Sequence, residues 1–147
     1  MLRTILFIGT GGFLGTVARF LFSKLSQQMF QTTFPIGTLI VNLTGCFILG
    51  IIYGLMERGE LFSSDVRLFL TVGFCGGFTT FSTFAFENAN MLRDGNFTQV
   101  ALYTGISVII GIAALIAGGV TTRLFWFIWF LESWNQTFKN EFFYLKT

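Results

Sequence analysis

The sequence lacks histidine altogether, has a single proline, and has only 11% charged residues over its 147 positions. A soluble domain usually carries about 25% charged residues. Without histidine, one chain cannot form a histidine-dependent catalytic site, so we expect no enzyme. The two cysteines, Cys46 and Cys75, lie in apolar runs, which predicts small buried side chains rather than a disulfide framework or a metal site. The net charge of +2 is too small to indicate a nucleic-acid partner.

Hydrophobic residues, by contrast, make up 53% of the chain. Because a bilayer core of about 30 Å needs about 20 apolar residues of helix, long apolar runs predict membrane-spanning helices. Four such helices are expected, over residues 5–22, 35–56, 68–92 and 97–123. The polar segment 23–34 is expected to form a loop, and residues 93–96 a turn. The prediction is an all-α integral membrane protein in the lipid bilayer, with residues 1–123 as its four-helix domain and the first run retained as a helix rather than cleaved.

The fourth apolar run continues past Arg123 as far as Leu131. Beyond it, Trp134, Phe138 and Phe142 recur every four residues, with polar residues between them. This spacing is typical of an amphipathic helix on a membrane surface. Residues 124–147 are therefore expected to form an aromatic-rich C-terminal extension, interfacial or protruding, without a role in transport.

The third run has a centre poorly suited to a membrane helix. Gly76 and Gly77 supply backbone freedom, and hydroxyl side chains follow at Thr79, Thr80, Ser82 and Thr83. Such a centre survives in a bilayer only where it faces protein, water or an ion. We therefore expect the helix to open over residues 76–79, at mid-membrane. Close packing of small residues is the alternative explanation.

Asn42 is the most informative polar residue of the second run. It lies four residues after Thr38, so the two share one helix face. A carboxamide in hydrocarbon is unfavourable unless it is hydrogen-bonded. Two explanations fit, a hydrogen bond between helices or an NH₂ donor directed into a pore.

Three further features have alternative interpretations. Arg19, near the end of the first run, either extends to the membrane surface or faces inward as a cation that favours an anion. Tyr103, Ser107 and Gly111 recur at intervals of four in the last run, as either a packing stripe or a polar track. Glu87 is expected near a pore mouth, as a carboxylate in water or with a vestibule or gating role.

Three motifs occur in order along the chain. They are Gly11-Gly-x-x-Gly-x-x-x-Arg19, Pro35-x-Gly-Thr-x-x-x-Asn42-x-x-Gly45, and Gly-Gly-Phe-Thr-Thr-Phe-Ser-Thr-Phe over residues 76–84. Together, over residues 5–122, they resemble the signatures of the Fluc (CrcB) fluoride channel family. The resemblance implies a fluoride-selective passive channel that exports cytoplasmic fluoride through the bacterial plasma membrane.

The resemblance also implies site residues. Phenylalanines with positive ring edges would line the anion path together with neutral donors, giving weak, multiple sites. The expected fluoride pathway residues are Asn42, Phe81, Phe84, Thr80, Ser82, Thr83, Tyr103, Ser107, Thr38 and Arg19. A structural Na⁺ at the dimer interface would be held by the backbone carbonyls of Gly76 and Thr79.

The basic residues are almost balanced between the two membrane sides. With four spans, one side of the membrane has four basic residues near the helix ends, namely Arg3, Arg58, Arg67 and Arg123. The other side has three, namely Arg19, Lys24 and Arg93. This gives almost no orientation bias, so the chain can insert both ways. The expected assembly is an antiparallel, dual-topology homodimer. The resemblance implies the same dimer, with two pores.

Two other functions remain as alternatives. A small multidrug-resistance-type transporter has the same size and dual topology, but exchanges protons through a carboxylate inside a helix. The first run here contains no Asp or Glu. A non-transporting membrane assembly factor would not need the polar residues described above. Anion-specific efflux from liposomes distinguishes these functions.

Overall fold

The computed structural model describes residues 1–30, 32–57 and 63–144, with side chains as far as Trp134. Within these ranges all regular structure is helical. Four segments are long and apolar enough to cross a membrane, as predicted. They are α1 (Leu2–Phe30), α2 (Ile36–Met56), a composite third segment (Ser64–Arg93) and the first part of α6 (Phe97–Tyr144).

The third segment is composed of four short elements. It begins with α3 (Ser64–Leu68), widens into the π-helix η1 (Phe69–Cys75), and continues through α4 (Gly76–Phe78). After two extended residues it resumes as α5 (Phe81–Arg93). A tight turn, in which Gly95 has a φ of 75°, then leads into α6, in agreement with the predicted turn at 93–96.

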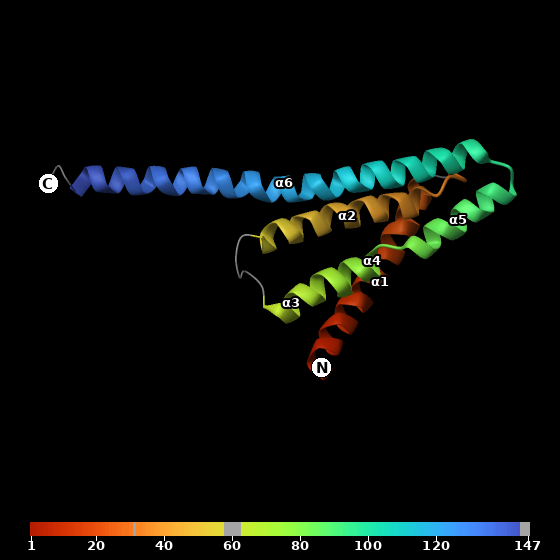
Figure 1. The fold of residues 1–147 in the computed structure, drawn as a ribbon, viewed down its shortest axis with the longest axis horizontal. Coiled ribbons are helices and arrows are strands. Elements are labelled where there is room, and N and C mark those ends of the chain that lie inside the picture. The colour runs from red at the N-terminus through yellow and green to blue at the C-terminus, as the bar shows by residue number, and fades with distance from the viewer. Residues whose placement is uncertain (31, 58–62, 145–147) are drawn as a thin grey trace.

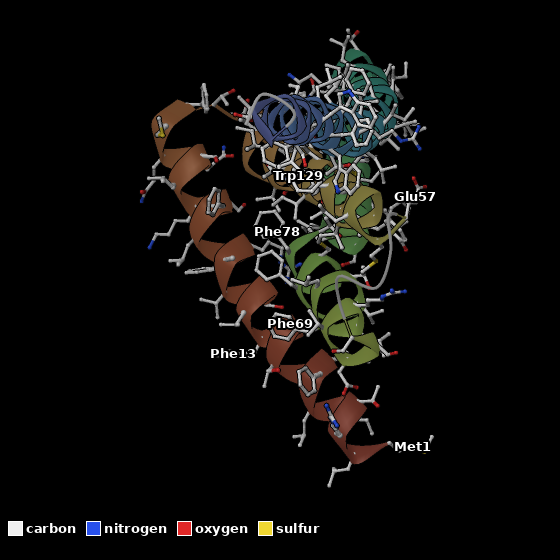
Figure 2. All side chains as sticks on the ribbon, turned by 90° about the vertical axis from the view of Figure 1, so that its left-hand side faces the viewer. Met1, Phe13, Glu57, Phe69, Phe78 and Trp129 are labelled. Atoms are coloured by element: carbon white, nitrogen blue, oxygen red, sulfur yellow. The ribbon has the colours of Figure 1, made fainter. Side chains whose placement is uncertain are left out.

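The helices pack in two main pairs (Figure 1). α2 lies along α6, and α1 crosses the first half of the third segment. Glycine permits both close approaches, since a Cβ on Gly118 would overlap the Phe47 carbonyl, and one on Gly15 would overlap the Phe74 carbonyl. Small residues at helix contacts are typical of membrane proteins. Phe78, the last residue of α4, is buried on the side of α4 that faces α1 (Figure 2). Its ring packs edge-on against that of Phe22 of α1, with centroids 6.0 Å apart.

The predicted loop at residues 23–34 is wrong over most of its length. α1 runs on to Phe30, because its last turns contain good helix formers and neither Gly nor Pro. The Gln27 side chain donates to the Thr32 carbonyl and accepts from the Gly37 amide, so it joins the end of α1 to the start of α2. The connection itself is therefore shorter than hydropathy indicates.

α6 is one continuous helix of 48 residues. Its length, about 72 Å at 1.5 Å per residue, is more than twice that of a bilayer core. In Figure 1 it runs to the left well past the ends of α2 and α3. The helix is not interrupted at residues 123–124, so the proposed start of the extension coincides with no change in backbone structure.

Candidate functional site

The third segment is interrupted at Thr79 and Thr80. Thr79 has φ −84° and ψ 158°, and Thr80 has φ −149° and ψ 114°, so both are extended. The prediction that the helix opens over 76–79 is therefore wrong for residues 76–78, which are helical. The glycines permit an opening, but its position depends on which backbone groups find other partners.

Asn42 supplies two of those partners. Its Oδ1 accepts a hydrogen bond of 2.8 Å from the Thr80 amide, and its Nδ2 donates one of 3.2 Å to the Thr80 carbonyl. Both backbone groups of one extended residue are thus bonded by a single carboxamide, in place of helical neighbours. This satisfies polar backbone that would be unfavourable in a low-dielectric interior.

The Thr80 hydroxyl begins the next helix. It accepts a hydrogen bond of 3.3 Å from the Thr83 amide as the N-cap of α5, and donates one of 3.0 Å to the Thr83 hydroxyl. The Ser82 hydroxyl lies 3.3 Å from the same oxygen. Three of the predicted pathway hydroxyls are therefore gathered at one helix N-terminus, where backbone N–H groups favour negative charge.

The interruption also changes the surroundings of two carbonyls. In a continuous α-helix the Gly76 carbonyl would accept from the Thr80 amide, and the Thr79 carbonyl from the Thr83 amide. Here those amides donate to Asn42 and to the Thr80 hydroxyl. Both carbonyls lose their helical donors, and carbonyl oxygen is a suitable ligand for a hard cation. The two carbonyls are therefore suitable in chemistry for the predicted Na⁺, whose binding stays a prediction.

A cavity of about 370 Å³ lies between α2, the interruption and α6; we call it the phenylalanine cavity. Its lining includes Asn42, Thr80, Phe81, Phe84 and Ser107. The rings of Phe81 and Phe84 have centroids 5.7 Å apart. The Ser107 hydroxyl is buried without a hydrogen-bond partner among the described residues. A buried orphan hydroxyl is unusual, and indicates a donor that is free to bind something else.

A second cavity, of about 720 Å³, lies between α1, α2 and α5; we call it the basic cavity. Arg19 and Lys24 of α1 line it, together with Thr38, Thr83 and Glu87. Thr80 lines both cavities, and the Asn42–Thr80 junction therefore lies where they adjoin.

Glu87 has a position that the sequence did not reveal. Its Oε1 accepts a hydrogen bond of 2.7 Å from Thr38, and its Oε2 accepts one of 2.7 Å from the Tyr103 hydroxyl. It therefore links α2, α5 and α6. The available signal was a carboxylate within an apolar run, about one turn after the last of the clustered hydroxyls, but sequence spacing does not show which helices surround it.

The structure brings together most of the predicted pathway residues. Arg19 and Thr38 line the basic cavity, and Thr83 does so too. Tyr103 lines neither cavity; it is fully buried, with its ring 5.0 Å from that of Phe84. Ser82, one of the three hydroxyls gathered at the N-terminus of α5, is exposed and also lies outside both linings.

The comparisons with known proteins bear directly on this arrangement. The family model described as "CrcB-like protein, Camphor Resistance (CrcB)" matches residues 6–119. The chain belongs to the CrcB-like family. Residues 6–119 of this chain include the lining of both cavities, the interrupted third segment and all the predicted site residues. Membership and four apolar helical segments together make it a multi-pass membrane protein.

Curated relatives of this CrcB-like chain are named "Fluoride-specific ion channel FluC". That of Azobacteroides pseudotrichonymphae genomovar. CFP2 is 42% identical over 125 residues, which cover 85% of this chain and 100% of the relative. That of Maridesulfovibrio salexigens is 41% identical over 119 residues, 81% of this chain and 94% of the relative. That of Chlorobium phaeobacteroides strain BS1 is 45% identical over 120 residues, 82% and 93% respectively.

Proposed function

We propose that this chain is a fluoride-selective passive channel that exports cytoplasmic fluoride, as an antiparallel homodimer with two pores and a central structural Na⁺. The observation on which this rests is the Asn42–Thr80 junction, at which the basic cavity and the phenylalanine cavity adjoin. The relatives' names and the family membership support the choice of ion.

The chemistry of the lining suits a small, strongly hydrated anion. On entry, Arg19 and Lys24 provide positive charge in the basic cavity, which raises the local anion concentration. At the junction, the Thr83 hydroxyl lies at the N-terminus of α5; it accepts from the Thr80 hydroxyl and keeps its own hydrogen as a donor. The Asn42 NH₂ group has one hydrogen besides the one donated to Thr80. These groups replace water as donors without a formal charge that would trap the ion.

The phenylalanine cavity continues the path on the other side of the junction. Phe81 and Phe84 present aromatic rings, whose edges carry partial positive charge. The orphan hydroxyl of Ser107 supplies a donor. No Asp, Glu, Lys or Arg is among the residues that line this cavity, so passage there depends on neutral groups alone.

The exposed surface at the interruption supports a dimer. Gly76 and Ser82 are exposed, and Phe81 is 79% exposed, in the single chain. Interrupted backbone facing lipid is unfavourable at membrane depth, so another protein surface must cover it. A second, inverted copy brings the two interruptions together at mid-membrane. The carbonyls of Gly76 and Thr79 from both copies then face one another, and Na⁺ relieves the repulsion between their dipoles.

Efflux from liposomes that contain the purified full chain tests this function. We expect fluoride efflux that needs no proton gradient and exceeds chloride efflux by orders of magnitude. Fluoride movement that strictly requires a proton gradient would favour the multidrug-resistance-type mechanism instead. Equal fluoride and chloride fluxes would contradict selectivity, and no flux from folded protein would favour an assembly factor.

A further inference from the structure

The C-terminal part of α6 lies outside the region shared with the family. The family match ends at residue 119, although α6 continues to Tyr144. The C-terminal end of α2 is joined to the middle of α6 near this point by an ion pair of 3.0 Å between Glu57 and Arg123, both exposed. Beyond Arg123, α6 runs alone, with no other described helix beside it (Figure 1).

The first two turns beyond this ion pair are apolar on every side. Residues 124–131 are eight consecutive apolar residues, and all are exposed, from 39% at Trp126 to 73% at Phe125. Eight residues at 3.6 per turn point in all directions around the helix axis. In Figure 2, which looks towards the C-terminal end of α6, Trp129 is labelled at this end of the helix.

This distribution indicates lipid rather than a protein partner. A second copy or another helix would cover one stripe of the surface and leave the opposite side in water. A helix that is apolar all round is instead typical of a membrane environment. The stretch is only about 12 Å long, too short for a crossing of its own. It is also bounded by the charged residues Arg123 and Glu132.

Trp126, Trp129 and Trp134 specify the depth. Tryptophan is enriched where the headgroups meet the acyl chains, because its ring is largely apolar and its N–H is a donor. All three tryptophans of the protein lie within residues 124–134, and all three are exposed.

The preceding turn contains a suitable place for a bend. The hydroxyls of Thr121 and Thr122 donate to the carbonyls of Gly118 and Gly119, over 2.6 and 2.7 Å. Hydroxyl bonds back to the preceding turn often bend helices. Gly118 itself is fixed against α2, so the helix can change direction only after this contact.

α6 is continuous through this turn in the structure of the single chain. We propose that in a bilayer it bends at residues 121–123, so that residues 124–134 lie in the headgroup–acyl interface, roughly parallel to the membrane plane. The arm anchors the end of α6 at the membrane surface. It does not depend on which ion the protein conducts.

Intrinsic fluorescence tests this proposal, because every tryptophan lies in the arm. The full chain is reconstituted in phosphatidylcholine vesicles brominated either near the glycerol backbone or near the chain ends. We expect stronger quenching by shallow bromines than by deep ones, and little quenching by aqueous iodide. Dominant iodide quenching would place the arm in water, dominant deep quenching would place it across the membrane, and no quenching would indicate a protein partner; each would overturn the proposal.

Three single-tryptophan variants separate a flat arm from an upright one. In each, two tryptophans are replaced by Phe, which keeps the surface apolar and leaves both cavities unchanged. The positions of Trp126 and Trp134 differ by about 12 Å along the axis. A flat arm gives similar shallow quenching at all three positions. A steady loss of quenching from Trp126 to Trp134 would show an upright helix and contradict the proposal.

Discussion

Both ends of the Asn42 carboxamide bond the backbone of Thr80, with Oδ1 2.8 Å from the amide nitrogen and Nδ2 3.2 Å from the carbonyl oxygen. Asn42 therefore holds the helix interruption in place and also lines the phenylalanine cavity. The two explanations considered for it, a hydrogen bond between helices and a donor to an ion, are compatible, since the NH₂ group has two hydrogens.

Replacing Asn42 by Asp tests this arrangement. The carboxylate keeps the bond from the Thr80 amide but loses the donor, and it places negative charge against the Thr80 carbonyl and against any entering anion. We expect fluoride flux to fall at least about tenfold, the equivalent of 1.4 kcal/mol. The lost hydrogen bond lowers the free energy of unfolding by about 1–3 kcal/mol. Both are measured on reconstituted protein, by efflux and by thermal unfolding.

Asn88→Asp is the matched control. Asn88 also donates from Nδ2 to a backbone carbonyl, that of Phe84, over 2.9 Å, but its own side chain does not bond the interruption and is not part of the lining of either cavity. The control should keep most of its flux. If Asn42→Asp folds and conducts like the wild type, Asn42 has no role in the path.

Phe81→Ile and Phe84→Ile test the aromatic lining. Isoleucine remains bulky and apolar but has no positive ring edge, so each variant should conduct fluoride several-fold more slowly. Phe86→Ile, on the same helix and outside both cavity linings, should conduct normally. Efflux rates at equal protein density provide the comparison. Normal rates in both cavity variants would refute the aromatic argument while leaving the fold untouched.

Gly118→Ala tests the close approach of α2 and α6. The added methyl would overlap the Phe47 carbonyl, a backbone atom that cannot rotate away. Overpacking of this kind lowers stability by about 1–3 kcal/mol, which should appear as a lower melting temperature in detergent. Gly105→Ala lies on the same helix with nothing within 4 Å, and should be neutral or slightly stabilising. Equal melting temperatures for the two variants would show that the contact is not tight.

Removal of Na⁺ tests the cation proposed for the Gly76 and Thr79 carbonyls. Exchange of Na⁺ for N-methylglucamine at constant ionic strength should abolish fluoride flux, because the facing carbonyls repel one another without a small cation. Return of Na⁺ should restore the flux. As a control, Na⁺ is exchanged for K⁺ in the same way. K⁺ has the same charge but is larger, so this exchange shows the effect of charge alone. Full flux after exhaustive removal of Na⁺ would argue against a structural ion.

The sequence determined the class of the fold through simple physical requirements. Apolar runs of about 20 residues can be stable only across a bilayer, so four spanning segments were predictable, as was the turn at 93–96, where only Gly95 has positive φ. The hydroxyl cluster and the carboxamide of Asn42 were recognisable because polar groups at such positions need partners. Hydropathy could not reveal that α1 continues to Phe30, since a helix needs no apolar residues in order to continue.

Tertiary structure decided how these residues are used. Gly76 and Gly77 made an opening possible, but the helix is interrupted at Thr79 and Thr80, because Asn42 of another helix bonds the backbone of Thr80 there. Glu87 acquires its position in the same way, from donors on α2 and α6 that lie 49 and 16 residues away. Such partners are brought together by helix packing, and spacing along the chain does not encode which helices will meet.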